Sequence, residues 1–167
     1  MPVDDLTPYE RVEIQMSMVV PLIRDLQSIL GEEVVMDALR ERHRRSVSEA
    51  RARARTDVPF ERRIDRIERD FSMFAAGGTL DYESRRTADG GLEFDVTRCR
   101  FAELMAGLDA RDLGSLLLYG QDEAVVAGAG THLDRTQTRM EGASHCDFRF
   151  RDSVGGKETK RGAEDEI

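Results

Sequence analysis

The stretch from His132 to Arg151 constrains the fold more than any other part of this chain. Its second half alternates apolar and charged residues in the order Cys146, Asp147, Phe148, Arg149, Phe150, Arg151. Neighbouring side chains of a β-strand point to opposite faces, so the alternation predicts a strand with one apolar and one charged face. Cys146 therefore shares the core-facing side with the two phenylalanines, and its thiol is expected to point inward.

The first half of the same stretch is expected to form the partner strand of a β-hairpin. The connection Glu141–Ser144 contains Gly142 and small or polar residues, which are typical of a turn between two alternating segments. On the first strand Thr136 and Thr138 share one face, and polar residues occupy both faces. A strand that only builds a core rarely has this pattern, so either a functional site or a solvated edge hairpin would explain it.

Three amphipathic helices are predicted before this region. The first begins with a capping box formed by Thr7 and Glu10 and ends at Gly31. The third has the clearest apolar stripe, with steps of three and four residues: Phe60, Ile64, Ile67, Phe71, Phe74. This spacing favours a helix that packs on the core, although an aromatic stripe can also line a ligand pocket.

The second helix, expected over about 32–55, has an arginine-rich face that invites a nucleic-acid interpretation. Pairs such as Glu41 and Arg45 stand four residues apart, as on an ordinary solvated helix. The net charge of −8 also argues against a nucleic-acid partner. We therefore interpret this face as solvated, and His43 in its apolar stripe as a packing residue.

A second hairpin is expected between the helices and the C-terminal stretch. Segments 80–86 and 92–97 alternate around Asp89, Gly90 and Gly91, and short helices follow between Phe101 and Val126. The order predicts an α+β fold in which N-terminal helices pack on an antiparallel sheet of two hairpins, with helices inserted between them. We expect one domain over 1–151 and a disordered polar tail over 152–167.

The composition indicates in which compartment the protein works and whether it enters a membrane. No apolar run is long enough to span a membrane, and the acidic N-terminus lacks the apolar region of a signal peptide. Two cysteines in such a chain suggest free thiols in a reducing compartment, so we expect a cytoplasmic protein. A disulfide between Cys99 and Cys146 is the alternative.

Several of these segments resemble the L-2-amino-thiazoline-4-carboxylic acid hydrolase family. The resemblance runs from about Asp95 to Arg151 and more loosely through the N-terminal helices. The family pattern has a cysteine before a short helix, a Cys-x-x-Asp segment, a Thr-x-Thr strand and a Gly-x-x-x-Cys-Asp-Phe strand. Its counterparts here are Cys99, Asp122, Thr136, Thr138, Gly142, Cys146, Asp147 and Phe148. The chain departs from the pattern at the middle cysteine, where Tyr119 stands.

The resemblance implies a hydrolase, acting on C–N bonds, that opens a small nitrogen- and sulfur-containing ring bearing a carboxylate. Such chemistry needs a nucleophile, a carboxylate for the ring nitrogens and an arginine for the substrate carboxylate. The predicted catalytic residues are Cys146, Asp122 and Cys99, with either a thiolate or an activated water as the nucleophile. The predicted substrate-binding residues are Thr136, Thr138, Arg135, Tyr119 and Asp147, with Arg139 and Arg149 as alternatives to Arg135. Tyr119 in place of the cysteine leaves three alternatives: a lost activity, a different ring or a biosynthetic intermediate as the substrate.

The sequence also allows two other functions. The order of helices and hairpins also resembles, more weakly, ligand-binding domains of the 4-vinyl reductase type, which would hold a hydrophobic ligand without catalysis. A helical interaction protein that dimerises through its first and third helices is a third interpretation, and a homo-oligomer is compatible with each. We expect a small-molecule substrate, no cofactor, no metal, no nucleic acid and no membrane. A metal site from Asp122, His132 and Asp147 is the least favoured alternative.

Overall fold

The computed structural model describes residues 6–54 and 56–153. Three helices come first: α1 (Pro8–Leu30), α2 (Glu32–Ala52) and α3 (Phe60–Ala75). A pair of strands follows, β1 (Leu80–Arg86) and β2 (Leu92–Cys99). The helical insertion comprises α4 (Arg100–Gly107), α5 (Arg111–Gly114), the π-helical turn η2 (Ser115–Tyr119) and α6 (Gly120–Gly128). Strands β3 (Thr131–Asp134) and β4 (Cys146–Asp152) complete the described chain.

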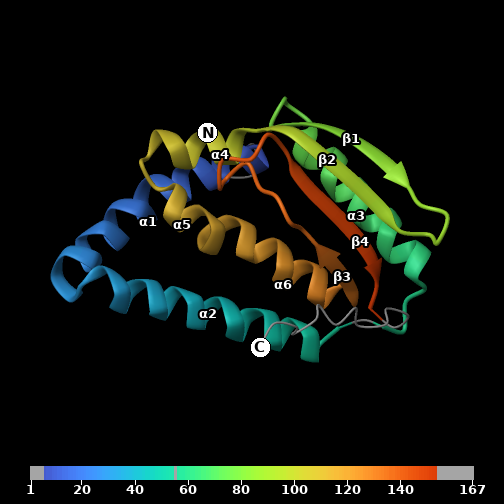
Figure 1. Cartoon of the computed structure of the whole chain (residues 1–167), viewed down its shortest axis with the longest axis horizontal. Helices are drawn as coiled ribbons and strands as arrows, with labels where there is room; N and C mark the ends of the chain where they lie inside the picture. Colours follow the sequence, from blue (N-terminus) through green and yellow to red (C-terminus); the bar gives the residue numbers. More distant parts are fainter. Residues whose placement is uncertain (1–5, 55, 154–167) are drawn as a thin grey trace, which may run out of the picture.

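The four strands form one antiparallel sheet in the order β1-β2-β4-β3 (Figure 1). Each hairpin pairs its own strands, and the two hairpins join where β2 pairs with β4. The predicted α+β fold with inserted helices is therefore confirmed. Asp152, which the sequence interpretation counted with the tail, is the last residue of β4. Ser153, also assigned to the expected disordered tail, forms a turn, and its Oγ donates to the carbonyl oxygen of Gly130. Residues 154–167 of the expected tail lie outside the described residues.

The first strand of the C-terminal hairpin is much shorter than its alternating sequence predicts. β3 ends at Asp134, and residues 135–145 form a loop with turns, so Thr136 and Thr138 are not strand residues. Side chains of β4 explain the difference. The Asp147 carboxylate accepts hydrogen bonds from the backbone N–H groups of Thr136 and Gln137, and Cys146 Sγ accepts one from Arg139 N–H. These donors are therefore not used in a backbone ladder.

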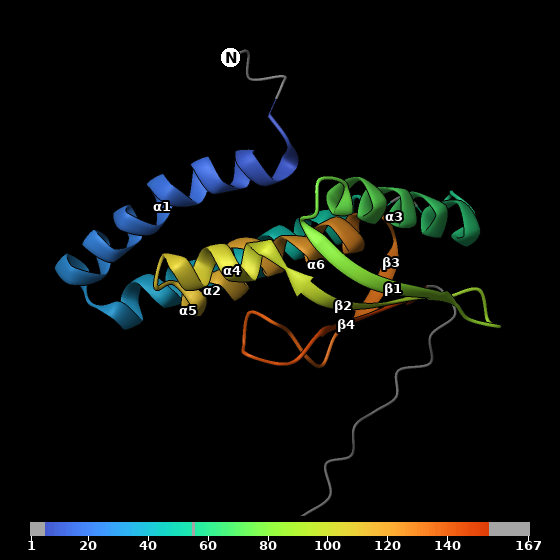
Figure 2. The same cartoon turned by 90° about the horizontal axis from the view of Figure 1, so that it is seen from above.

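Helix α3 packs directly on the inner face of the sheet, whereas α1 and α2 pack mainly on other helices. Helix α3 lies along this face (Figure 2), where Phe71 stacks on Phe94 of β2 with ring centroids 4.0 Å apart. Helix α2 runs beside α6, and α1 contacts both α2 and α4. The capping box predicted at Thr7 and Glu10 is present. The inner face of β4 is buried as predicted at Cys146, Phe148 and Phe150.

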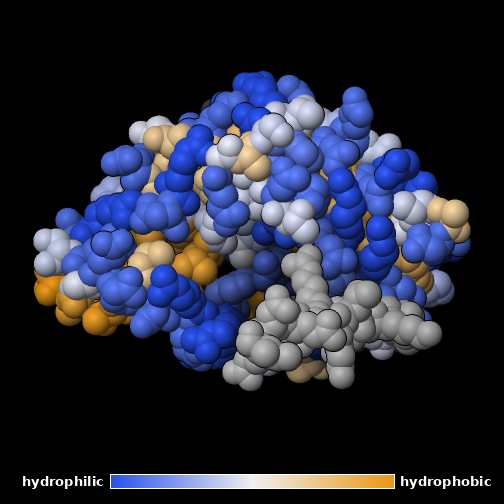
Figure 3. All heavy atoms as spheres, in the orientation of Figure 1, coloured by the Kyte–Doolittle hydropathy of each residue, from blue (hydrophilic) through white to orange (hydrophobic). Residues whose placement is uncertain are grey.

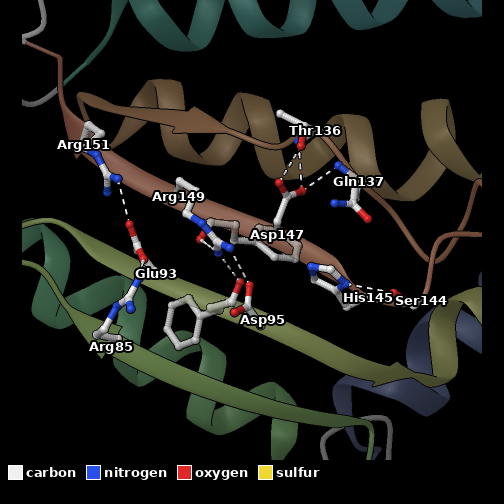
Figure 4. Close-up of polar contacts among 12 residues, drawn as sticks. Arg85, Glu93, Asp95, Thr136, Gln137, Ser144, His145, Asp147, Arg149 and Arg151 are labelled. Atoms are coloured by element: carbon white, nitrogen blue, oxygen red, sulfur yellow. Dashed lines mark hydrogen bonds and ion pairs between the residues drawn. The ribbon is translucent and has the colours of Figure 1, made fainter.

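The outer face of the sheet is charged, with ion pairs between neighbouring strands (Figure 4). Arg149 on β4 pairs with Asp95 on β2 at 2.6 Å, and Arg151 pairs with Glu93 at 2.8 Å. Arg85 on β1 reaches Glu93 from the other side. Because these ion pairs occupy the outer face, the apolar face of the sheet is directed toward the interior of the molecule.

Exposed apolar side chains gather at the end of the molecule formed by the turn between α1 and α2 (Figure 3). Ile29, Leu30 and Val34 are all more than half exposed there. Among the described residues, no helix combines the length and apolarity that crossing a bilayer requires.

Candidate functional site

A cavity of about 320 Å³ lies between the inner face of the sheet and the surrounding helices. Its wall is formed by α1, α3, β1, β2, α4, β4 and the helical segment η2–α6. Most of the lining side chains are apolar: Val12, Met16, Ile67, Phe71, Phe74, Leu80, Val96, Phe101, Leu118, Val125, Val126, Phe148, Phe150. The polar side chains are few: Gln15, Asp70, Cys99, Tyr119, Gln121, Asp122, Cys146. An apolar wall with a small number of polar groups is typical of a small-molecule site.

Two thiols and one phenol meet on the sheet side of the cavity. Tyr119 Oη donates a hydrogen bond to Cys99 Sγ at 3.4 Å and lies 3.6 Å from Cys146 Sγ. Cys99 is the last residue of β2 and Cys146 the first of β4, so the sheet holds both sulfur atoms. Both cysteines are buried and free. The disulfide alternative is therefore not realised, and the Tyr119 hydroxyl contacts both sulfur atoms instead.

The local helix geometry brings Tyr119 to this position. Residues 115–119 form a π turn between α5 and α6, and Tyr119 is its last residue. An inserted π turn rotates the following helix relative to the preceding one, and such turns are frequent at functional sites. Gly120 lets α2 approach here, because a Cβ at this position would lie 2.7 Å from His43 Nδ1. His43 is thus a packing residue, as predicted, and also contacts Glu123 at 3.0 Å.

Asp122 supplies one of the two carboxylates of the cavity wall, and it stands three residues beyond Tyr119 on the same side of the helix. Arg135 Nη1 donates to its Oδ2 at 3.0 Å, and Arg135 Nη2 donates to the carbonyl oxygen of Tyr119. The guanidinium also lies 4.8 Å from the ring centre of Tyr119 and 5.1 Å from that of Phe148. The Arg135 side chain is only 9% exposed, whereas that of Asp122 is 44% accessible. Asp122 is therefore reachable from the cavity, and Arg135 is held behind it.

Three groups of the cavity wall, Asp122, Cys99 and Tyr119, have raised pKa values. Desolvation in the largely apolar cavity raises the pKa of Asp122 to about 6, although 44% of its side chain is accessible and Arg135 opposes the shift. Burial also raises the pKa of the Cys99 thiol, although the Tyr119 hydrogen bond opposes that shift. The pKa of Tyr119 lies far above its ordinary value, because of burial and the two nearby sulfur atoms. Tyr119 consequently remains a protonated hydrogen-bond donor throughout the neutral range.

The family model for L-2-amino-thiazoline-4-carboxylic acid hydrolase matches residues 11–150. This chain belongs to that hydrolase family. The match extends through the N-terminal helices, well beyond the C-terminal segments that carry the sequence resemblance. A comparison with curated proteins finds no match.

The structure brings Cys99, Asp122 and Cys146 of the hydrolase pattern together around one cavity, with Tyr119 beside them. Tyr119 stands where the family pattern has its middle cysteine, and it contacts both remaining thiols. The position is thus still part of the cluster, with a phenol in place of a third thiol. The roles predicted for these residues stay predictions, but their convergence is the geometric condition that those roles need.

The two threonines and Asp147 of the hydrolase pattern do not line the cavity. The Asp147 carboxylate accepts from Thr136 Oγ1 at 2.7 Å, from Thr136 N–H and from Gln137 N–H (Figure 4). Burial tends to raise the pKa of Asp147, but these hydrogen bonds outweigh it and lower the pKa. Thr138 is buried, and its Oγ1 accepts from Glu141 N–H. These residues fasten the loop that carries Arg135 and Arg139.

The predicted arginines all have other partners. Arg139 donates to the carbonyl oxygen of Ser144, and Arg149 lies on the outer face with Asp95. Among the described residues no group of three His, Cys, Asp or Glu side chains comes together as a metal site would need. In the alternative metal set, His132 contacts Asp134, Asp147 accepts from Thr136, and Asp122 accepts from Arg135, so each side chain has a different partner.

The structure adds cavity residues that the sequence interpretation did not select. Asp70 and Phe74 on α3 and Val12 and Met16 on α1 line the wall. Phe74 and Phe71 belong to the aromatic stripe, for which a pocket wall was the less favoured interpretation. The i+4 spacing of Val12 and Met16 shows only that they share a helix face. Only the tertiary packing shows that the face borders an open space.

Proposed function

We propose that this protein is a hydrolase that opens a small ring containing a C=N carbon between nitrogen and sulfur, or a related cyclic amidine or amide. The observation that carries the proposal is the meeting of Cys99, Tyr119, Cys146 and Asp122 on one cavity of about 320 Å³. Membership of the hydrolase family supports the reaction class. The ring type within that class is the proposal's own step.

The reaction balances with water as the only co-substrate. Water oxygen bonds to the ring carbon of the C=N unit and produces a tetrahedral centre that carries nitrogen, sulfur and oxygen. The carbon–sulfur bond then breaks, the sulfur leaves with a proton from the added water, and the carbon becomes a carbamoyl group. In a thiazoline-type ring the bond that opens is thus the carbon–sulfur bond, whereas in a cyclic amide or amidine it is the carbon–nitrogen bond that the family resemblance implies. The ring carbon is a weak electrophile, so catalysis requires that the flanking nitrogens be protonated and held during attack.

Asp122 is the group best suited to hold those nitrogens. Its Oδ2 is bound by Arg135, and among the described residues no hydrogen bond to Oδ1 is found. A carboxylate beside an N–C–N unit accepts two N–H bonds and stabilises its positive charge. With a pKa of about 6, the group is mostly ionised at neutral pH, yet it remains able to exchange a proton. We therefore assign it substrate binding and proton transfer.

Cys146 is the better placed of the two thiols for nucleophilic attack. Its Sγ accepts a hydrogen bond from Arg139 N–H at 3.2 Å and lies beside the Tyr119 hydroxyl. The N–H donor aimed at this sulfur would stabilise the negative charge that it carries during attack. Burial raises the pKa of the other thiol, Cys99. In the thiolate route Cys146 Sγ bonds to the ring carbon, the ring carbon–sulfur bond breaks, and the departing sulfur takes the proton of the Cys146 thiol. Water then adds to the same carbon, and Cys146 leaves as a thiol with one of the water protons, so that the carbon becomes a carbamoyl group. In the water route the same carbon takes hydroxide directly while Asp122 accepts the proton.

A non-catalytic ligand-binding module is the second candidate, and one observation favours it. Aromatic and aliphatic side chains dominate the cavity wall, as a hydrophobic ligand would require. The two candidates differ in what happens to a bound ring. A binding module returns it unchanged, and a hydrolase releases a new carbamoyl or carboxylate product.

The test incubates the pure protein with a panel of thiazolines, hydantoins and lactams and follows new products by mass spectrometry. We expect ring opening of at least one thiazoline or cyclic amidine, and its loss in Asp122→Asn. Cys146→Ser separates the routes: full turnover would exclude the thiolate route and leave water as the nucleophile. Stoichiometric binding without any product across the panel would favour the binding module.

A further inference from the structure

We propose that the cavity is built for a cationic, amidine-like ring that carries an apolar substituent of aromatic size, and not for a free ring carboxylate. This inference deepens the proposed function and rests on it for the reaction. It concerns the substrate class, which follows from the charge, composition and volume of the wall. The family's named substrate carries a carboxylate, so this member would differ in specificity.

Charge is the first argument. The wall contains two carboxylates, Asp70 and Asp122, and among the described residues it contains no arginine, lysine or histidine. A carboxylate moved from water into such a space would lose its hydration, gain no ion pair and meet two groups of its own sign. A protonated amidine-like ring would instead be attracted, and the net charge of −8 acts in the same direction.

The nearest guanidinium does not change this balance. Arg135 already donates to Asp122 Oδ2 and to the Tyr119 carbonyl oxygen, and it lies against the rings of Tyr119 and Phe148. Turning it toward a substrate carboxylate would break both hydrogen bonds and leave the Asp122 carboxylate without its ion pair. Recognition of a free carboxylate would thus cost the site the acid group that we assign to the ring nitrogens.

Size and wall chemistry give the second argument. The cavity could hold roughly ten water molecules at about 30 Å³ each, which is more space than one five-membered ring fills. Helices α1, α3 and α4 contribute mainly apolar side chains to the wall, among them Val12, Phe71, Phe74 and Phe101, with Gln15 and Asp70 as the polar exceptions. Phe74 is still 36% exposed, although its ring lies 6.3 Å from that of Phe101. An aromatic substituent on the ligand would cover these surfaces.

The test compares two ligands that differ only in the ring substituent: 2-amino-2-thiazoline-4-carboxylate and its analogue with a benzyl group in place of the carboxylate. Titration calorimetry on the full-length protein gives the dissociation constants, and mass spectrometry follows products in parallel. We expect the benzyl analogue to bind at least tenfold more tightly. Equal or tighter binding of the carboxylate would overturn the inference.

Two variants of α3 provide the matched control. Phe74→Ala removes a ring from the cavity wall, whereas Met73→Ala removes a side chain that is 54% exposed and does not line the cavity. We expect Phe74→Ala to weaken binding of the benzyl analogue at least fivefold, and Met73→Ala to leave it unchanged. Equal effects of the two variants would refute the proposed placement of the substituent.

The binding measurement tests the ligand class, and the product measurement tests the hydrolase activity, so either can be refuted without the other. Tight, Phe74-dependent binding of the benzyl analogue without product would support the ligand class and count against hydrolysis. Turnover of the carboxylate with weak binding of the analogue would support hydrolysis and overturn the ligand class. In the latter case Arg135→Met should abolish carboxylate binding, because a displaced Arg135 would be its ion-pair partner.

Discussion

Tyr119 Oη lies 3.4 Å from Cys99 Sγ and 3.6 Å from Cys146 Sγ, so one phenol joins two thiols that are 47 residues apart in sequence. The contact connects the ends of β2 and β4 to the π turn before α6. All three side chains are buried, and Tyr119 is held protonated by a pKa far above its ordinary value. The cluster therefore contributes to the stability of the fold, and its Tyr119 hydrogen bond lowers the pKa of Cys99 against the effect of burial.

Replacing Tyr119 with phenylalanine should affect both properties. Loss of one buried hydrogen bond should lower the free energy of unfolding by about 1 kcal/mol, measured by urea denaturation. The Tyr119 hydrogen bond lowers the pKa of Cys99, so its removal should raise that pKa further. In a Cys146→Ser background, the pH midpoint for alkylation of Cys99 should therefore move upward. An unchanged midpoint would mean that the hydroxyl does not interact with the sulfur.

The pH dependence of ligand binding should report the ionisation of Asp122. Its pKa of about 6 means that the carboxylate forms as the pH rises through that value. Affinity for a cationic ring should therefore increase from pH 5 toward pH 7, levels chosen about one unit on either side of the pKa. Asp122→Asn should remove the inflection. Arg135→Met should move it to higher pH, because Arg135 opposes the upward shift.

Asp122 should have the opposite pH effect on folding. Its folded pKa is raised above the ordinary value, so the folded state holds this proton more tightly than the unfolded chain does. The resulting stabilisation is fully present below the unfolded pKa and is lost as the pH rises through about 6. Urea denaturation across this range should show the loss in the native protein and a smaller loss in Asp122→Asn. Parallel pH profiles for the two proteins would contradict it.

The sequence was most informative where the regular spacing of apolar residues along one strand or helix shows which face is buried. The alternation of Cys146, Phe148 and Phe150 correctly identified the inner face of β4, and the stripe that includes Phe71 correctly identified the buried side of α3. Both follow from local geometry, in which a residue's neighbours on its own element fix the direction of its side chain. Asp122 and Cys146 also line the same cavity, as the predicted site requires.

The prediction failed where side chains compete with the backbone for hydrogen bonds. Thr136 and Thr138 alternate as strand residues do, yet Asp147 binds the N–H groups of Thr136 and Gln137 and bends the chain into a loop. Alternation alone contains no information about such long-range side-chain acceptors. The pairing of Arg135 with Asp122 was likewise invisible, because it depends on how the loop crosses α6.

Asp147→Ala should test whether this residue anchors the loop or binds substrate. The variant leaves two backbone N–H groups and the Thr136 hydroxyl without their acceptor, so we expect a loss of about 2–3 kcal/mol in unfolding free energy. Amide hydrogen exchange at Thr136 and Gln137 should become faster by a large factor. A direct role in binding would instead weaken ligand affinity with little change in stability or exchange.

At Gly114 an added methyl group should destabilise the fold, although in most helix positions it stabilises it. Its backbone is helical, with φ −61° and ψ −37°, so alanine would ordinarily stabilise it. A Cβ here would, however, lie 2.2 Å from Met140 Sδ, and Met140 is only 1% exposed. We expect Gly114→Ala to lower the free energy of unfolding by about 1–3 kcal/mol, as overpacked cores do.

Gly107→Ala is the matched control, since it also lies in a helix but would place its Cβ in open space. It should leave stability unchanged or raise it by up to about 1 kcal/mol. Because Met140 closes the loop that carries Arg135 over α5, Gly114→Ala should also weaken ligand binding, whereas Gly107→Ala should not. Adding Met140→Ala to Gly114→Ala should cost less than the sum of the two single changes, because the clash is then removed. Strictly additive effects in urea denaturation would show that the two side chains do not meet.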